Sequence, residues 1–119
     1  MNIEREYSEM VAALAKPGHE ILHSMGPNDA HNLHMAVGIS GEAGELLDAI
    51  KKAVIYRKPL DTENVIEELG DLEYYLHGLR DSLGISREET IIHNMNKLRK
   101  RYPSGNYTNA HAQTRLDKA

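Results

Sequence analysis

The sequence predicts an all-α fold resembling a four-helix bundle, on three observations. Apolar residues recur at steps of three and four along most of the chain. Residues that cap or end helices separate these segments. No segment alternates apolar and polar residues as a half-buried strand does. The 119 residues are enough for one domain.

The first of four predicted helices lies at the N-terminus. Apolar residues at helical spacing favour a helix that begins at Ile3 and continues until Lys16-Pro17-Gly18 stops it. Residues 19–25 add a further helical turn before Gly26-Pro27 breaks the chain.

Two long helices follow. Asn28 or Asp29 is a suitable N-cap for a helix that continues to about Tyr56. Asp61 is the N-cap of the next helix. That helix carries a packing seam with steps of four and three, formed by Val65, Leu69, Leu72, Leu76, Leu79 and Leu83.

The last long helix is bounded on both sides. Gly84 suits the left-handed position after a helix end, and Ser86 opens a capping box for the helix that follows. Tyr102-Pro103 is its natural limit. We therefore expect an all-α domain over residues 1–103 and a polar C-terminal tail over residues 104–119.

Composition restricts the classes of function. The absence of Cys excludes disulfides, thiolate metal sites and cysteine nucleophiles, which leaves oxygen or His ligands for a metal. No apolar run approaches the roughly 18 residues of a membrane span, and the N-terminus is charged, so we expect a cytoplasmic protein without a membrane partner. The basic residues 97–101 belong to a chain of net charge −4, and we interpret them as a cationic helix end and not as a nucleic-acid site.

The apolar content predicts a thin core. Leu, Ile and Val number 26, and the chain has no Phe or Trp. A single subunit of this size would be marginally stable, so we expect at least a homodimer.

Two pairs of acids stand three residues apart, Glu42 with Glu45 and Glu68 with Asp71. This spacing places both carboxylates of a pair on one helix face, where they repel each other. Two such pairs on successive helices call for a cation, and oxygen ligands indicate Mg²⁺ or Mn²⁺. The alternative is an acidic, solvated face.

Other polar residues accompany the acids. Three glycines in the same predicted helix, Gly38, Gly41 and Gly44, suggest close approach of a ligand or of another helix. Asn94, Lys97 and Arg101 form a polar, cationic stripe on the last long helix that suits phosphate oxygens. His34 shares the carboxylate face and could contact a sugar or base, although a lone histidine there is more often a packing or solvent-exposed residue.

The combined pattern resembles a known family. The motif Glu42-x-x-Glu45, 22 intervening residues and Glu68-x-x-Asp71 within Glu67-Glu68-Leu69-Gly70-Asp71 resembles the all-α nucleoside triphosphate pyrophosphohydrolases of the MazG type. The run from Asn94 to Pro103 is similar to the fourth helix of that family. The similarity covers about residues 30–103.

The resemblance implies an activity and assigns the site. It implies hydrolysis of a (deoxy)nucleoside triphosphate to a monophosphate and pyrophosphate, as nucleotide-pool housekeeping by a homodimer or homotetramer with its site near the interface. It also implies that phosphates are held by Lys97, Arg101 and Asn94. The Mg²⁺-binding and catalytic residues would be Glu42, Glu45, Glu68 and Asp71.

Two alternatives stay open. Phosphoribosyl-ATP pyrophosphohydrolases share the helical fold and acidic metal site but act on one specific adduct. A non-catalytic helical oligomer would carry the same acids merely as surface residues, and their substitution would then leave metal affinity unchanged.

Overall fold

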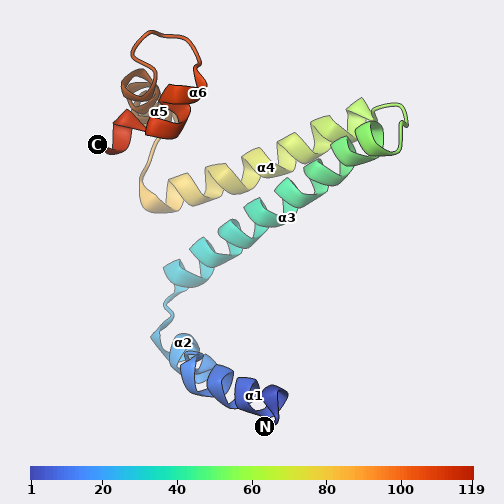
Figure 1. Cartoon of the computed structure of the whole chain (residues 1–119), viewed down its shortest axis with the longest axis vertical. Helices are drawn as coiled ribbons and strands as arrows, with labels where there is room; N and C mark the ends of the chain where they lie inside the picture. Colours follow the sequence, from blue (N-terminus) through green and yellow to red (C-terminus); the bar gives the residue numbers. More distant parts are fainter.

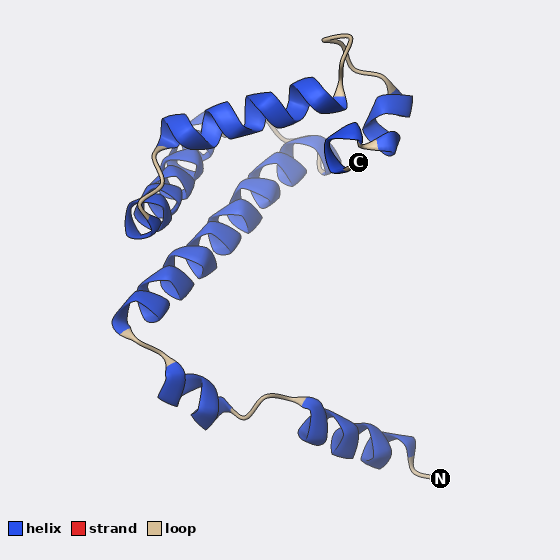
Figure 2. Cartoon of the chain, turned by 90° about the vertical axis from the view of Figure 1, so that its left-hand side faces the viewer, coloured by secondary structure: helices blue, strands red, loops and turns tan.

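The computed structural model describes residues 1–119 and confirms the all-α fold, with helices and no strands (Figures 1 and 2). Its elements are α1 (Ile3–Leu14), α2 (Gly18–Ser24), α3 (Pro27–Ile55), α4 (Thr62–Leu83), α5 (Arg87–Arg101), α6 (Asn109–Thr114) and the short 3₁₀ helix η1 (Leu116–Lys118). No helix combines the length and the apolarity that crossing a membrane requires.

The capping residues act largely as their types predict. The side chains of Asp61 and Ser86 accept hydrogen bonds from the backbone in the first turns of α4 and α5. Gly84 ends α4 in the left-handed conformation, with φ 67°. The predicted start of α3 was wrong: Pro27 is its first residue, and Asp29 accepts a hydrogen bond from the Gly26 N–H at 2.9 Å from within the first turn.

Helices α3 and α4 form an antiparallel pair joined by residues 56–61, and this is the main packing interface of the chain (Figure 1). At one end of the pair, the Ser82 hydroxyl donates to Asn32 at 2.6 Å. His31 Nε2 lies 3.3 Å from the Gly78 carbonyl oxygen nearby. These contacts fix the register of the two helices.

The faces of α3 and α4 that meet are only partly apolar. On α3 the side that contains Glu42 packs against α4, while the apolar side is exposed at Leu33, Val37, Leu47 and Val54. On α4 the predicted seam is only partly covered, because Leu69 and Leu83 are exposed. Within one chain, α3 and α4 therefore meet along partly polar faces, and much of their apolar surface is exposed.

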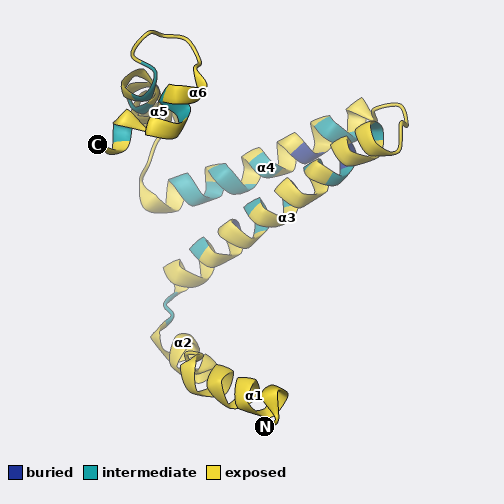
Figure 3. Ribbon diagram, in the orientation of Figure 1, coloured by how far each residue is buried: buried dark blue, intermediate teal, exposed yellow.

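The chain as a whole is open. Its radius of gyration is 20.5 Å, whereas a compact domain of this length has about 13–14 Å. Only three residues are buried, Met35, Ala49 and Glu68 (Figure 3). Helices α1 and α2 extend away from the other elements, and the apolar residues of α1 are exposed (Figure 2). One chain alone encloses almost no core.

The C-terminal residues fold onto α5. Residues 104–119 contain α6 and η1, and both pack against α5. This group of elements stands apart from the middle of the α3–α4 pair (Figure 1).

Candidate metal and nucleotide site

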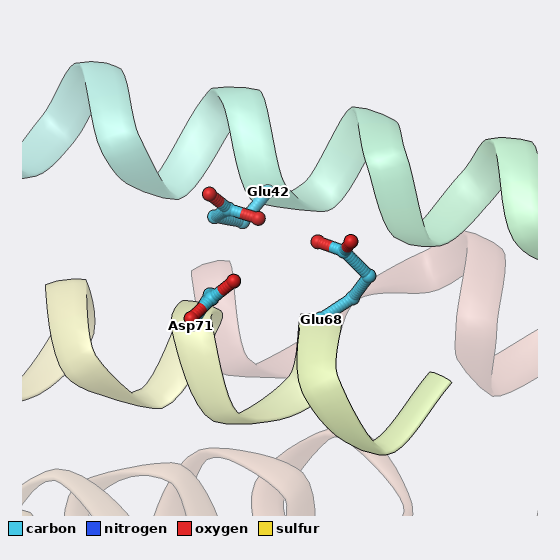
Figure 4. Close-up of side chains that lie close together, drawn as sticks. All are labelled: Glu42, Glu68 and Asp71. Atoms are coloured by element: carbon cyan, nitrogen blue, oxygen red, sulfur yellow. The ribbon is translucent and has the colours of Figure 1, made fainter. Parts of the chain in front are cut away.

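Three of the four predicted carboxylates converge between α3 and α4. Glu42 extends from α3 toward Glu68 and Asp71 on α4 (Figure 4). One oxygen from each of the three lies within 4.8 Å of the others. We call these three residues, with the neighbouring Glu45, the carboxylate cluster.

The cluster contains polar atoms without partners. Glu68 is only 7% exposed, and Glu42 is half-buried. The Oε2 atoms of both residues are buried and lack a hydrogen-bond partner. A buried carboxylate oxygen without a donor is costly, so these two atoms require a proton or a cation.

The electrostatics of Glu68 reflect the same crowding. The pKa of Glu68 is raised to about 7, first because its carboxyl interacts directly with that of Glu42, next because it is buried, and then because Glu45 is close. Glu45 therefore lies near enough to interact with the cluster, although its side chain is exposed.

The donor set fits a hard divalent cation. All four groups are carboxylates, and two of them hold buried oxygens with no competing donor. Mg²⁺ prefers oxygen ligands and usually keeps several waters, which the exposed side of the cluster at Asp71 would admit. The acidic cluster could therefore bind a metal.

Of the three glycines in α3, only one marks a close approach. A Cβ on Gly38 would overlap the ring of Tyr75 on α4, whereas a Cβ on Gly41 or Gly44 would meet nothing within 4 Å. Gly38 lies one turn before Glu42. Its missing side chain lets the helices come close enough for the carboxylates to meet.

The predicted phosphate-binding residues lie elsewhere in the chain. Asn94 is exposed and Lys97 is half-buried, and both belong to α5. Helix α5 stands apart from the middle of the α3–α4 pair (Figure 1). Arg101 Nε and Nη2 donate to Asp117 Oδ1 and Oδ2 at 2.8 and 3.0 Å. One chain therefore does not bring the cationic stripe and the acids together.

The predicted base- or sugar-contacting residue has an aromatic neighbour. His34 is exposed, and its ring packs edge-on against Tyr75 with 6.1 Å between ring centroids. It precedes Glu42 by eight residues on α3, about 12 Å along the axis. The structure thus places it on the cluster side of α3 but not in the cluster.

Comparison with models of protein families assigns the chain to one family. The model of the MazG nucleotide pyrophosphohydrolase domain matches residues 29–105. The chain belongs to the MazG family. Its MazG domain spans nearly all of α3 together with α4 and α5, and so includes both acidic pairs and the cationic stripe. Comparison with curated proteins and with solved structures gives no significant match.

Membership in the MazG family indicates nucleotide pyrophosphohydrolase activity in general and hence a nucleotide substrate.

The sequence pattern did not single out Asp117, which follows the matched region and binds Arg101. A signal for it exists, because Asp117 is the only acid among six basic residues in positions 90–119.

Proposed function

We propose that this protein is a Mg²⁺-dependent pyrophosphohydrolase that converts a (deoxy)nucleoside triphosphate to the monophosphate and pyrophosphate. The observation that carries the proposal is the convergence of carboxylates from two helices with two buried, unpaired oxygens. Mn²⁺ would suit the same donors. Family membership supports the reaction class.

Charge makes a metal necessary for this reaction. A nucleoside triphosphate carries about four negative charges, and the cluster presents up to four carboxylates. Bound Mg²⁺ would neutralise phosphate charge and polarise the attacking water. The metal would be held by Glu42, Glu45, Glu68 and Asp71.

The chemical step is a hydrolysis at the α-phosphorus. The oxygen of water forms a bond to this atom, the bond to the oxygen that bridges to the β-phosphorus breaks, and pyrophosphate leaves. A carboxylate of the cluster accepts the proton of the water. Lys97 and Asn94 would contact the phosphates, and His34, which packs beside Tyr75, would contact the sugar or base.

The first test is pyrophosphate release from the eight common NTPs and dNTPs, with Mg²⁺ or with EDTA. We expect equimolar monophosphate and pyrophosphate in Mg²⁺ and none in EDTA. Turnover of common triphosphates would also exclude a specialised phosphoribosyl-ATP enzyme. A folded protein that hydrolyses none of them in Mg²⁺ contradicts the proposal.

The proposed active form is a homodimer or homotetramer. The apolar side of α3 is exposed at Leu33, Val37 and Leu47, with exposed fractions of 55%, 61% and 68%. The acids and the cationic stripe lie apart within one chain. A second copy would cover this apolar side, and we propose that the α5 of a neighbouring copy supplies the cationic stripe to the carboxylate cluster.

Light scattering after size exclusion tests this assembly. We expect two or four times the chain mass for the native protein, and a loss of mass and of activity for Leu47→Glu, which places a charge on the apolar side. The control is Lys51→Glu, because Lys51 is exposed on the same helix and already polar. A native protein that is monomeric and active would contradict the assembly.

A further inference from the structure

A basic pocket lies between α5 and η1, outside the carboxylate cluster. It has a volume of about 310 Å³ and no hydrophobic lining residue. The lining residues are His93, Asn96, Lys97, Lys100, Asp117 and Lys118. Three lysines therefore line one polar space.

The single acid in this lining is already neutralised. Both oxygens of Asp117 accept hydrogen bonds from Arg101, and the Asp117 side chain is 2% exposed. In every other ion pair of the chain, both side chains are about half exposed or more. The pocket thus keeps the charge of its three lysines.

The same ion pair fixes the second wall of the pocket. Residue 117 belongs to η1, a helix of three residues that packs on α5. A helix this short has almost no stability of its own. The bidentate pair between Arg101 and Asp117 anchors η1, and it thereby holds Lys118 across from Lys97 and Lys100.

We propose that residues 116–118 complete a polyphosphate-binding pocket, in which Lys100 and Lys118 act beside Lys97 and Arg101 is a positioning residue that anchors η1 through Asp117. Arg101 Nε and Nη2 both donate to Asp117. In this proposal Arg101 therefore contributes by holding η1, and with it Lys118, in place. The identity of the ligand, the phosphates of a nucleotide, rests on the proposed function.

Binding of inorganic tripolyphosphate to the full-length, metal-free protein tests the pocket by calorimetry. Without metal, the carboxylate cluster repels this probe. We expect Lys100→Gln and Lys118→Gln each to weaken binding about fivefold. The control is Arg99→Gln, which removes the same charge from α5 but lines a different pocket. Equal weakening in all three variants, or none in Lys118→Gln, overturns the proposal.

A double-mutant cycle tests the role of Arg101. Arg101→Lys keeps the charge but cannot form the same bidentate pair. If Arg101 positions η1, Lys118→Gln has little further effect in the Arg101→Lys background. If Arg101 binds phosphate directly, the two losses multiply, and the positioning role is wrong. Asp117→Asn should remove the effect of Lys118→Gln in the same way, which repeats the test with Arg101 intact.

These outcomes are separate from those of the proposed function. Tripolyphosphate binding needs no hydrolysis and no metal. Normal Mg²⁺-dependent pyrophosphate release with no effect of Lys118→Gln on tripolyphosphate binding would overturn only the pocket. Normal pocket binding without any hydrolysis of nucleotides would overturn only the proposed activity.

Discussion

Replacing Glu68 by Gln is expected to lower Mg²⁺-dependent pyrophosphate release at least about 100-fold, and to raise the thermal stability of the metal-free protein. Glu68 is the most enclosed carboxylate of the cluster and lies against Glu42 and Glu45. An amide removes a metal ligand, but it also removes repulsion and can donate to an unpaired carboxylate oxygen.

Initial rates and thermal unfolding with Mg²⁺ and with EDTA measure the two effects. The matched control is Glu67→Gln, because Glu67 is the adjacent acid and is exposed outside the cluster. That variant should keep the activity and the stabilisation by Mg²⁺ of the native protein. Full activity in Glu68→Gln would show that the acids are only a surface feature.

The pH dependence of the free energy of unfolding should also reflect the raised pKa of Glu68. The pKa of Glu68 is about 7 in the folded chain, above its ordinary value of 4.5. Between these values the folded state keeps a proton that the unfolded state has lost. The free energy of unfolding in EDTA therefore falls as pH rises from about 4.5 to about 7, and this contribution levels off above. Chemical denaturation across this range should show a smaller slope in Glu68→Gln.

Gly38→Ala is expected to have the second large effect, a destabilisation of about 1–3 kcal/mol together with loss of activity. The added Cβ would overlap the ring of Tyr75 close to its attachment point, so α3 and α4 must move apart. Because Glu42 follows one turn later, the separation also spreads the carboxylate cluster.

Gly41→Ala is the matched control for this change. Its Cβ would meet nothing within 4 Å, and Ala is favoured over Gly in a helix by up to about 1 kcal/mol. Denaturant titrations of both variants should therefore give opposite signs. An equal loss of stability in both would contradict the assignment of the close approach to Gly38.

The helices could be predicted because their signals are local. Asp61, Gly84 and Ser86 act within a few residues of themselves. The structure shows Asp61 and Ser86 as N-caps and Gly84 as the left-handed end of α4, although only the bond accepted by Ser86 forms from the predicted capping box. The facing of α3 could not be predicted in this way. Periodicity identifies its apolar side, but it does not say whether the same chain or another molecule covers that side.

The candidate site could likewise be predicted only in part. The spacing within two acidic pairs, Glu42 with Glu45 and Glu68 with Asp71, indicated a shared metal site. The structure brings three of these four carboxylates together in one group, without Glu45. The pairing of Arg101 with Asp117 spans 16 residues, which include irregular segments and α6. No periodic pattern relates two elements across such a connection, so only the fold could reveal that contact.

The small interior of the chain has a consequence for its energetics. With three buried residues, one molecule gains little from the hydrophobic effect to offset the entropy of ordering 119 residues. In the proposed homo-oligomer, folding would therefore be coupled to association, and we expect a melting temperature that falls as the protein is diluted.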